Sequence, residues 1–305
     1  MIFQNKIATT LASRTTGNLR LQMKPEQRFL SLHKEFWANV RTISQEVGYT
    51  ERGAGTIKIP KLKDIKSKFK DLKLDTHHIC NEAEQLTEFG KTLFAYFEYR
   101  AEILNGFVQS QLMNKESAEI EFEKIKSRLT PSCPLPLNKQ KGEKKNYAFL
   151  TGMVNMLIEE GLGGLKCDYD PRALTTITHN GQPLRTLARR VDGAFPSVIN
   201  PIAIWEIKEY YYTTTFGSRV ADGVYETLLD GMELEELKHS TNRKVQHLLI
   251  VDDYFTWWDC GRSYLCRMID MLHMGYVDEV IFGREVTTRI PLIAKEWKEN
   301  FLQTK

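Results

Sequence analysis

The chain has 305 residues, of which 42% are hydrophobic and 27% are charged, and its formal net charge is +3. This composition is ordinary for globular proteins and excludes a disordered chain, a collagen and a coiled-coil rod. No apolar run reaches the ~18 residues of a membrane span, and no signal peptide is visible. The five cysteines show no CxxC spacing, which is typical of reduced thiols in the cytosol. We therefore expect a cytoplasmic protein of about two domains, without membrane contact.

The first part of the sequence has the apolar periodicity of helices. Apolar residues recur at helical spacing in four segments. One of them carries seven lysines between Lys58 and Lys73 but only two acids. A glycine-rich turn that contains Arg52 precedes this lysine-rich segment. The predicted helices are 25–47, 57–74, 81–111 and 114–129.

A proline-rich stretch follows these helices. Thr130-Pro-Ser-Cys-Pro-Leu-Pro-Leu contains three prolines within six residues, and a helix cannot continue through them. The polar segment 139–145 comes next. Because extended, proline-rich segments act as spacers between domains, we predict a mostly helical domain over 1–138 and a second domain over 139–305.

The second part alternates helices with strand-like segments. His179-Asn-Gly-Gln contains the Asn-Gly pair of a tight β-hairpin turn. The order α-β-β-β-α-β-α-β-α predicts a layered α/β domain with a mixed sheet. The predicted helices are 146–161, 219–237, 261–274 and 291–301, and the predicted strands are 173–178, 184–194, 202–211, 245–252 and 279–282.

The most informative residues lie on two consecutive predicted strands. Asp192 ends one strand, and Glu206 and Lys208 follow fourteen and sixteen residues later within the next. Side chains alternate between the faces of a strand, so Glu206 and Lys208 share a face. Burying such charges among apolar neighbours is costly unless they are paired or bind a ligand. A hairpin-type connection would bring Asp192 beside Glu206, which places two carboxylates and one ammonium group together.

This combination suits metal-assisted chemistry on phosphates. Two carboxylates and a main-chain carbonyl form an all-oxygen site of the kind that Mg²⁺ prefers. The ion lowers the pKa of a bound water and neutralises charge on a phosphate in line for attack. A neighbouring lysine can orient or deprotonate that water and contact the phosphate. The alternative interpretation is a salt bridge at a strand end.

Asp192 together with Glu206-Ile207-Lys208 resembles the D-(x)n-(D/E)-x-K signature of the PD-(D/E)XK nuclease superfamily, which includes most type II restriction endonucleases. The predicted α-β-β-β-α-β order within 143–285 also resembles that superfamily's core. The resemblance implies that Asp192, Glu206 and the Ile207 carbonyl bind Mg²⁺ and that Lys208 positions the attacking water. This sequence departs from the family's signature at one position, where Val191 replaces the nominal proline before the aspartate.

Many members of this superfamily add a glutamate from the preceding helix to the site. The candidates are Glu143, near the predicted helix start, and Glu159 or Glu160, near its end. We favour Glu143 because the interior of the predicted helix holds no acid.

Two segments outside the signature predict DNA contacts. Residues 210–219 are aromatic and hydroxyl-rich and end at a predicted helix start, a common place for phosphate contacts. The lysine-rich helix suits a small helical DNA-binding module. An ordinary loop and a solvated helix face are the respective alternatives. The predicted DNA-binding residues are Arg52, Lys58, Lys61, Lys66, Lys68, Ser218 and Arg219.

Other acidic residues have simpler interpretations. Asp222 and Glu226 are spaced to form a charge network with Arg219 along one helix, which we prefer to a second metal site. Asp252 and Asp253 follow a predicted strand, and we prefer a capping or turn role for them to a place in a cleft.

These features together predict a Mg²⁺-dependent, sequence-specific endonuclease of the restriction type that acts on double-stranded DNA. Cutting both strands requires two active sites, and a homodimer would supply them. A repair or nicking nuclease of the same fold is one alternative. A non-catalytic DNA-binding protein with a degenerate nuclease domain is the other.

Overall fold

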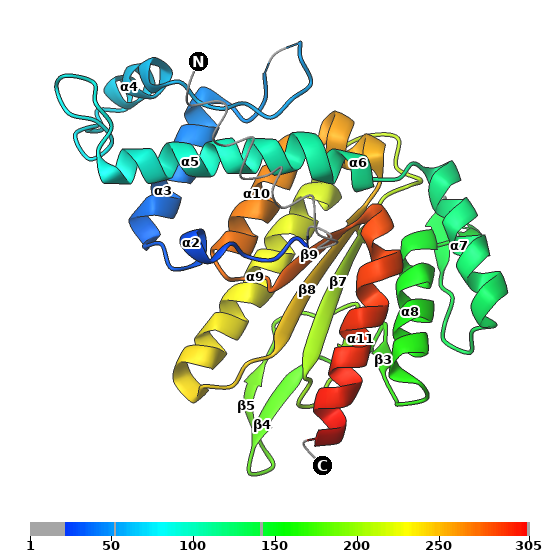
Figure 1. Ribbon diagram of the computed structural model, residues 1–305. Coiled ribbons are helices and arrows are strands. Elements are labelled where there is room, and N and C mark those ends of the chain that lie inside the picture. The colour runs from blue at the N-terminus through cyan, green and yellow to red at the C-terminus, as the bar shows by residue number, and fades with distance from the viewer. Residues whose placement is uncertain (1–21, 52, 141–142, 304–305) are drawn as a thin grey trace, which may run out of the picture.

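A five-stranded mixed sheet lies at the centre of the computed structural model, which describes residues 22–51, 53–140 and 143–303 (Figure 1). The strand order is β3-β6-β7-β8-β9. Strand β6 pairs antiparallel with both β3 and β7, whereas β7, β8 and β9 are parallel to one another. The strands are β3 (Asp168–Tyr169), β6 (Gly193–Phe195), β7 (Ala203–Glu209), β8 (Gln246–Asp252) and β9 (Glu279–Phe282).

Helices cover both faces of this sheet (Figure 1). Alternate residues of β7 and β8, such as Trp205 and Leu248, pack into one core with α8 (Phe149–Leu162) and α11 (Val286–Gln303). The opposite face, with Leu249 of β8, packs against α9 (Ser218–Thr241) and α10 (Arg262–His273). This arrangement confirms the predicted mixed α/β class with a mixed sheet.

The N-terminal part is helical, as predicted. A buried ion pair joins it to the sheet domain, because Arg100 Nη1 lies 2.9 Å from Asp270 Oδ1 of α10. None of the helices in the described ranges has the length and apolarity needed to cross a bilayer. The helices are α2 (Gln27–Leu30), α3 (Lys34–Val47), α4 (Leu62–Asp71), α5 (Glu88–Ile103), a π-helical turn (Leu104–Val108), α6 (Gln109–Gln111) and α7 (Lys115–Leu129).

Several helices begin or end at other residues than predicted. The helix predicted over 81–111 begins only at Glu88, because the Thr87 hydroxyl accepts a hydrogen bond from Gly90 N at 3.0 Å. The helix predicted over 25–47 is interrupted between α2 and α3. The helix predicted over 291–301 begins earlier than Pro291, because α11 starts at Val286, directly after a 3₁₀ turn.

Two hairpins form separate two-stranded sheets outside the central sheet. The predicted Asn180-Gly181 turn joins β4 (Thr176–His179) to β5 (Gln182–Thr186), and both turn residues have positive φ, at 49° and 77°. The strand predicted over 184–194 was wrong as a single element, because it divides between β5 and β6. A second hairpin, β1 (Leu137–Gln140) with β2 (Glu143–Tyr147), precedes α8 and was not predicted. The domain boundary at 138 stays a prediction.

Candidate active site

The β6–β7 pairing brings Asp192 to the predicted signature. Gly193 is opposite Trp205 in the sheet, so continuing the register by one residue places Asp192 opposite Glu206. Asp192 Oδ2 accepts a hydrogen bond from Ile207 N at 2.7 Å. The carboxylate of Asp192 is therefore held against the main chain between Glu206 and Lys208.

Glu206 and Lys208 lie on one face of β7 and form a buried ion pair. Lys208 Nζ is 3.1 Å from Glu206 Oε2, and their side chains are only 8% and 0% exposed. Trp205 and Ile207 point to the other face, into the core under α8 and α11. The alternation expected from the sequence is thus present, and it aims the charged pair toward α9.

Three residues that the sequence did not connect to the signature complete the cluster. Arg189 Nη1 lies 2.9 Å from Glu206 Oε1 and 2.5 Å from Asp230 Oδ2. Glu226 Oε2 lies 3.4 Å from both Arg189 Nη2 and Lys208 Nζ. We call Asp192, Glu206, Glu226 and Asp230 the carboxylate cluster.

The predicted charge network of Asp222 and Glu226 with Arg219 was wrong for Glu226, which pairs with Arg189 and Lys208 instead. Glu226 and Asp230 are one turn apart on α9 and turn toward β7, where two cations attract them. The only sequence signal for this contact was the acidic i,i+4 spacing itself. Glu226 remains 46% exposed, so the cluster is open to solvent beside α9.

The charges of the cluster depend on one another. Burial and the nearby Glu206 carboxylate raise the pKa of Asp192 to about 7. The same two causes raise the pKa of Asp230 to about 7. Burial also acts to raise the pKa of Glu206, but the Lys208 and Arg189 cations outweigh it and lower that pKa. When all four carboxylates are ionised, they exceed the two cations by two charges, which equals the charge of one divalent ion.

The donor set fits a hard cation. Within the described ranges no three His, Cys, Asp or Glu side chains are placed as a metal site. The candidate donors are therefore two carboxylates, Asp192 and Glu206, and the carbonyl of Ile207. A strand residue directs its N–H and C=O toward the same neighbour, so this carbonyl lies on the Asp192 side. Glu206 Oε1 is buried and accepts no hydrogen bond from the described residues, although Arg189 Nη1 lies 2.9 Å from it as an ion-pair partner. These oxygens match the preference of Mg²⁺.

The predicted third acid lies elsewhere. Glu143 is not on a helix, because it belongs to β2, which pairs with β1, and α8 begins six residues later. Glu159 Oε2 accepts from Ser132 N at 3.1 Å, and Glu160 Oε2 accepts from Arg128 Nη2 at 3.0 Å. Glu159 and Glu160 thus form hydrogen bonds with the segment that precedes the β1–β2 hairpin.

The predicted DNA-binding residues have different environments. Ser218 and Arg219 are exposed at the first turn of α9. Lys58 Nζ donates to Val47 O at 3.1 Å, and Lys66 Nζ lies 2.5 Å from Glu84. Lys61 and Lys68 are exposed, whereas Arg52 lies outside the described residues.

The lysine-rich helix does not reach the carboxylate cluster. Figure 1 places α4 beside the start of α5, well away from β7. Helix α4 is therefore remote from Asp192 and Lys208.

Asp253, directly after β8, has the capping role that we preferred, whereas Asp252, the last residue of β8, makes long-range contacts instead. Asp252 Oδ1 accepts from Met113 N at 2.7 Å, which ties the segment before α7 to β8. Asp253 Oδ2 accepts from Thr256 N at 2.8 Å and thereby caps the following turn.

Two family models match the chain. A domain of unknown function, DUF7690, matches residues 23–107. A second domain of unknown function, DUF7687, matches residues 113–297 and includes the whole carboxylate cluster. The searches of curated proteins and of solved structures each gave no match. Since the second model spans more than half of the sequence, the chain belongs to the DUF7687 family.

Proposed function

We propose that this protein is a Mg²⁺-dependent, sequence-specific endonuclease of the restriction type, which hydrolyses phosphodiester bonds in double-stranded DNA through a PD-(D/E)XK site. The observation that carries this proposal is the contact of Asp192 with the Glu206-Ile207-Lys208 segment across the β6–β7 pair. Apart from the separate β4–β5 hairpin, the order α8-β3-β6-β7-α9-β8 supports it, because it corresponds to the α-β-β-β-α-β order that the sequence resemblance implies.

Each residue of the site would have a distinct task. Asp192, Glu206 and the Ile207 carbonyl would hold Mg²⁺, which when bound makes water more acidic and neutralises phosphate charge. Burial acts to lower the pKa of Lys208, but Glu206 and Asp192 outweigh it and raise that pKa, so Lys208 stays protonated. A protonated Lys208 cannot accept a proton. Its role would be to orient the water and to contact the phosphate.

Arg189 and Asp230 would support Glu206. Arg189 contacts both oxygens of Glu206, with Nη2 at 3.0 Å from Oε2, and Asp230 holds the same guanidinium. A carboxylate fixed in this way keeps its charge and its orientation before the metal arrives. Ser218 and Arg219, exposed at the start of α9, would contact the DNA backbone near the cluster.

Removal of divalent cations is expected to abolish cleavage and to leave DNA binding largely intact. Ca²⁺ should support binding but not cutting, because it prefers more ligands and longer bonds than Mg²⁺ and activates water less well. The measurement is a supercoiled-plasmid assay with Mg²⁺, Ca²⁺ or EDTA, paired with a mobility-shift assay.

The products of this assay separate the alternatives. Discrete linear fragments support a restriction-type endonuclease, and nicked circles or a smear favour a repair or nicking nuclease of the same fold. A mobility shift without cutting in Mg²⁺ favours a non-catalytic DNA-binding protein. Full cleavage in excess EDTA would exclude the metal mechanism.

The exposed lysines of the N-terminal part give a second test. Replacing Lys61 and Lys68 with glutamine should weaken DNA binding equally for all sequences and reduce the salt dependence by ~0.9 log units per lost phosphate contact. Lys66 is a poorer target because its Nζ lies 2.5 Å from Glu84, whereas Lys68 Nζ is 3.9 Å from Asp71. The control replaces Lys124 and Lys295, which are exposed on α7 and α11. An unchanged salt slope would mean that α4 is a solvated surface.

A further inference from the structure

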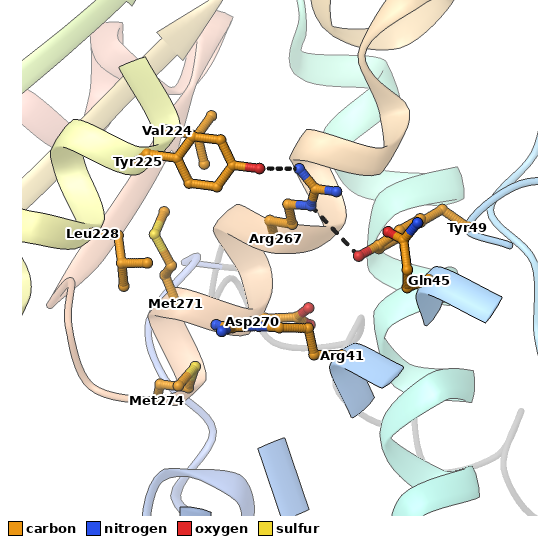
Figure 2. Close-up of a pocket in the computed structure, with 10 residues that line it drawn as sticks. All are labelled: Arg41, Gln45, Tyr49, Val224, Tyr225, Leu228, Arg267, Asp270, Met271 and Met274. Carbon is orange, nitrogen blue, oxygen red and sulfur yellow. Dashed lines mark hydrogen bonds between the residues drawn. The ribbon is translucent and has the colours of Figure 1, made fainter. Parts of the chain in front are cut away.

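A pocket of about 280 Å³ lies between the N-terminal helix α3 and helices α9 and α10 of the sheet domain (Figure 2). Val224 and Leu228 of α9 and Met271 of α10 form an apolar wall. Arg41 and Gln45 of α3 line the other side. Because residues matched by both family models build it, this pocket lies at the kind of domain junction where small ligands commonly bind.

The pocket carries an excess of positive charge. Its charged lining residues are Arg41, Arg267 and Asp270. The Asp270 carboxylate already accepts from Arg100 Nη1, at 2.9 and 3.1 Å, and from the Tyr96 hydroxyl at 2.5 Å. Two arginines therefore face the pocket without an acid of their own in it, and the charge suits an anionic group.

Tyrosines hold Arg267 in a fixed orientation. Its Nη1 donates to Tyr225 Oη at 2.6 Å and its Nε donates to Tyr49 Oη at 3.5 Å, as Figure 2 shows. The guanidinium also lies 4.6 Å from the centre of the Tyr264 ring. Two of its five N–H groups are thus used, and the others remain for a ligand.

Arg41 and Gln45 supply further donors at the pocket. In residues 22–51, 53–140 and 143–303, neither side chain has a hydrogen-bond or ion-pair partner. Both are exposed on α3 and line the pocket opposite the apolar wall. They are therefore available to a bound molecule.

We propose that this pocket binds one nucleoside monophosphate unit, with its phosphate between Arg41 and Arg267 and its base against the apolar wall. Arginine pairs bind phosphate through parallel N–H groups, and tyrosine rings and apolar side chains stack on bases. The Gln45 amide and the spare lone pairs of Asp270 match the donors and acceptors on a base edge. The volume is at the small end of ligand pockets, which suits one nucleotide.

This site is separate from the carboxylate cluster. Val224 and Leu228 are each two residues from Glu226, which is ~200° around a helix of 3.6 residues per turn. One side of α9 therefore faces the pocket and the other faces Lys208. The nucleotide can come from solution or from an unpaired position in a nucleic acid, and the inference holds whether or not the protein cleaves DNA.

The test is calorimetric titration of the full chain, in EDTA, with dAMP and dCMP and with inorganic phosphate and the nucleosides for comparison. We expect one site per chain for at least one mononucleotide. Phosphate and nucleosides should bind at least about tenfold more weakly, because each lacks half of the contacts. Arg41→Gln should weaken binding by about tenfold, and Gln45→Trp, which fills the pocket from an exposed position, should abolish it. Lys34→Gln, elsewhere on α3, is the matched control.

A second titration identifies the source of the nucleotide. An oligonucleotide with one unpaired base should be compared with its fully paired form. If only the former binds, and binds through Arg41, the nucleotide belongs to a nucleic acid. The proposal is overturned if neither the mononucleotides nor the oligonucleotide with an unpaired base binds. It is also overturned if Arg41→Gln and Gln45→Trp leave binding unchanged, or if inorganic phosphate binds as tightly as the mononucleotide. Lys208→Ala should leave these titrations unchanged, so failure of this site and failure of the nuclease proposal are separate results.

Discussion

Replacing Lys208 with alanine is expected to abolish DNA cleavage while the protein still folds and binds DNA. The proposed mechanism needs Lys208 to orient the water and contact the phosphate, and the loss of one such preorganised donor typically slows a reaction by about 10²–10³-fold. Mg²⁺ should still bind, because Asp192 and Glu206 remain. Glu206 also keeps its second cation, Arg189, at 2.9 Å. Plasmid cleavage and mobility-shift assays at matched protein concentrations measure the two effects.

The two metal-binding carboxylates need different substitutions. Glu206→Ala would remove the carboxylate between the half-buried Arg189 and the buried Lys208 and leave a cavity beside these two cations. Glu206→Gln keeps the side-chain volume and is therefore the better variant. Asp192→Asn and Asp192→Ala should fold, because the pKa of Asp192 near 7 shows that its charge is already disfavoured. All these variants should lose cleavage, and double variants should be little worse than singles because the three groups act as a unit.

A matched control and a contrary result complete this test. Lys244→Ala removes an exposed lysine that pairs with Asp278 on the surface, and it should cleave normally. Near wild-type cleavage by both Lys208→Ala and Glu206→Gln would contradict the nuclease proposal. The Glu206–Lys208 pair would then be a structural salt bridge.

Arg100→Met is expected to cause the largest loss of stability, about 3–5 kcal/mol in the free energy of unfolding. Arg100 is only 1% exposed and joins Ser44 of α3 to Asp270 of α10, at 2.9 Å to each. Methionine fills similar space but leaves Asp270 without its cation. Urea unfolding followed by circular dichroism measures the change.

The control for this prediction is a surface pair. Arg128→Met breaks a contact with Glu160 on a side chain that is 53% exposed, and it should cost less than about 1 kcal/mol. Arg100→Met with Asp270→Asn should cost less than the sum of the two single changes, because the double variant has no unpaired charge. Equal losses for Arg100→Met and Arg128→Met would show that the buried pair does not hold the two parts together.

Local patterns in the sequence determined the mixed α/β class and the central part of the candidate site. Alternation along 202–211 was enough to place Glu206 and Lys208 on one face, and Asn180-Gly181 was enough to predict a hairpin. These features depend on backbone geometry and on residues close in sequence, so a short segment contains the information.

Only the tertiary structure decided which distant charges join the site and where the pocket forms. Arg189 meets Asp230 across forty-one residues, and the complete burial of the Asp230 carboxylate, not the spacing, makes a cation necessary there. Pairing with β1 placed Glu143 in a strand, although the sequence suggested the start of a helix. Arg41 and Arg267 line one pocket because α3 packs beside α10, and no local pattern encodes a contact between segments more than two hundred residues apart.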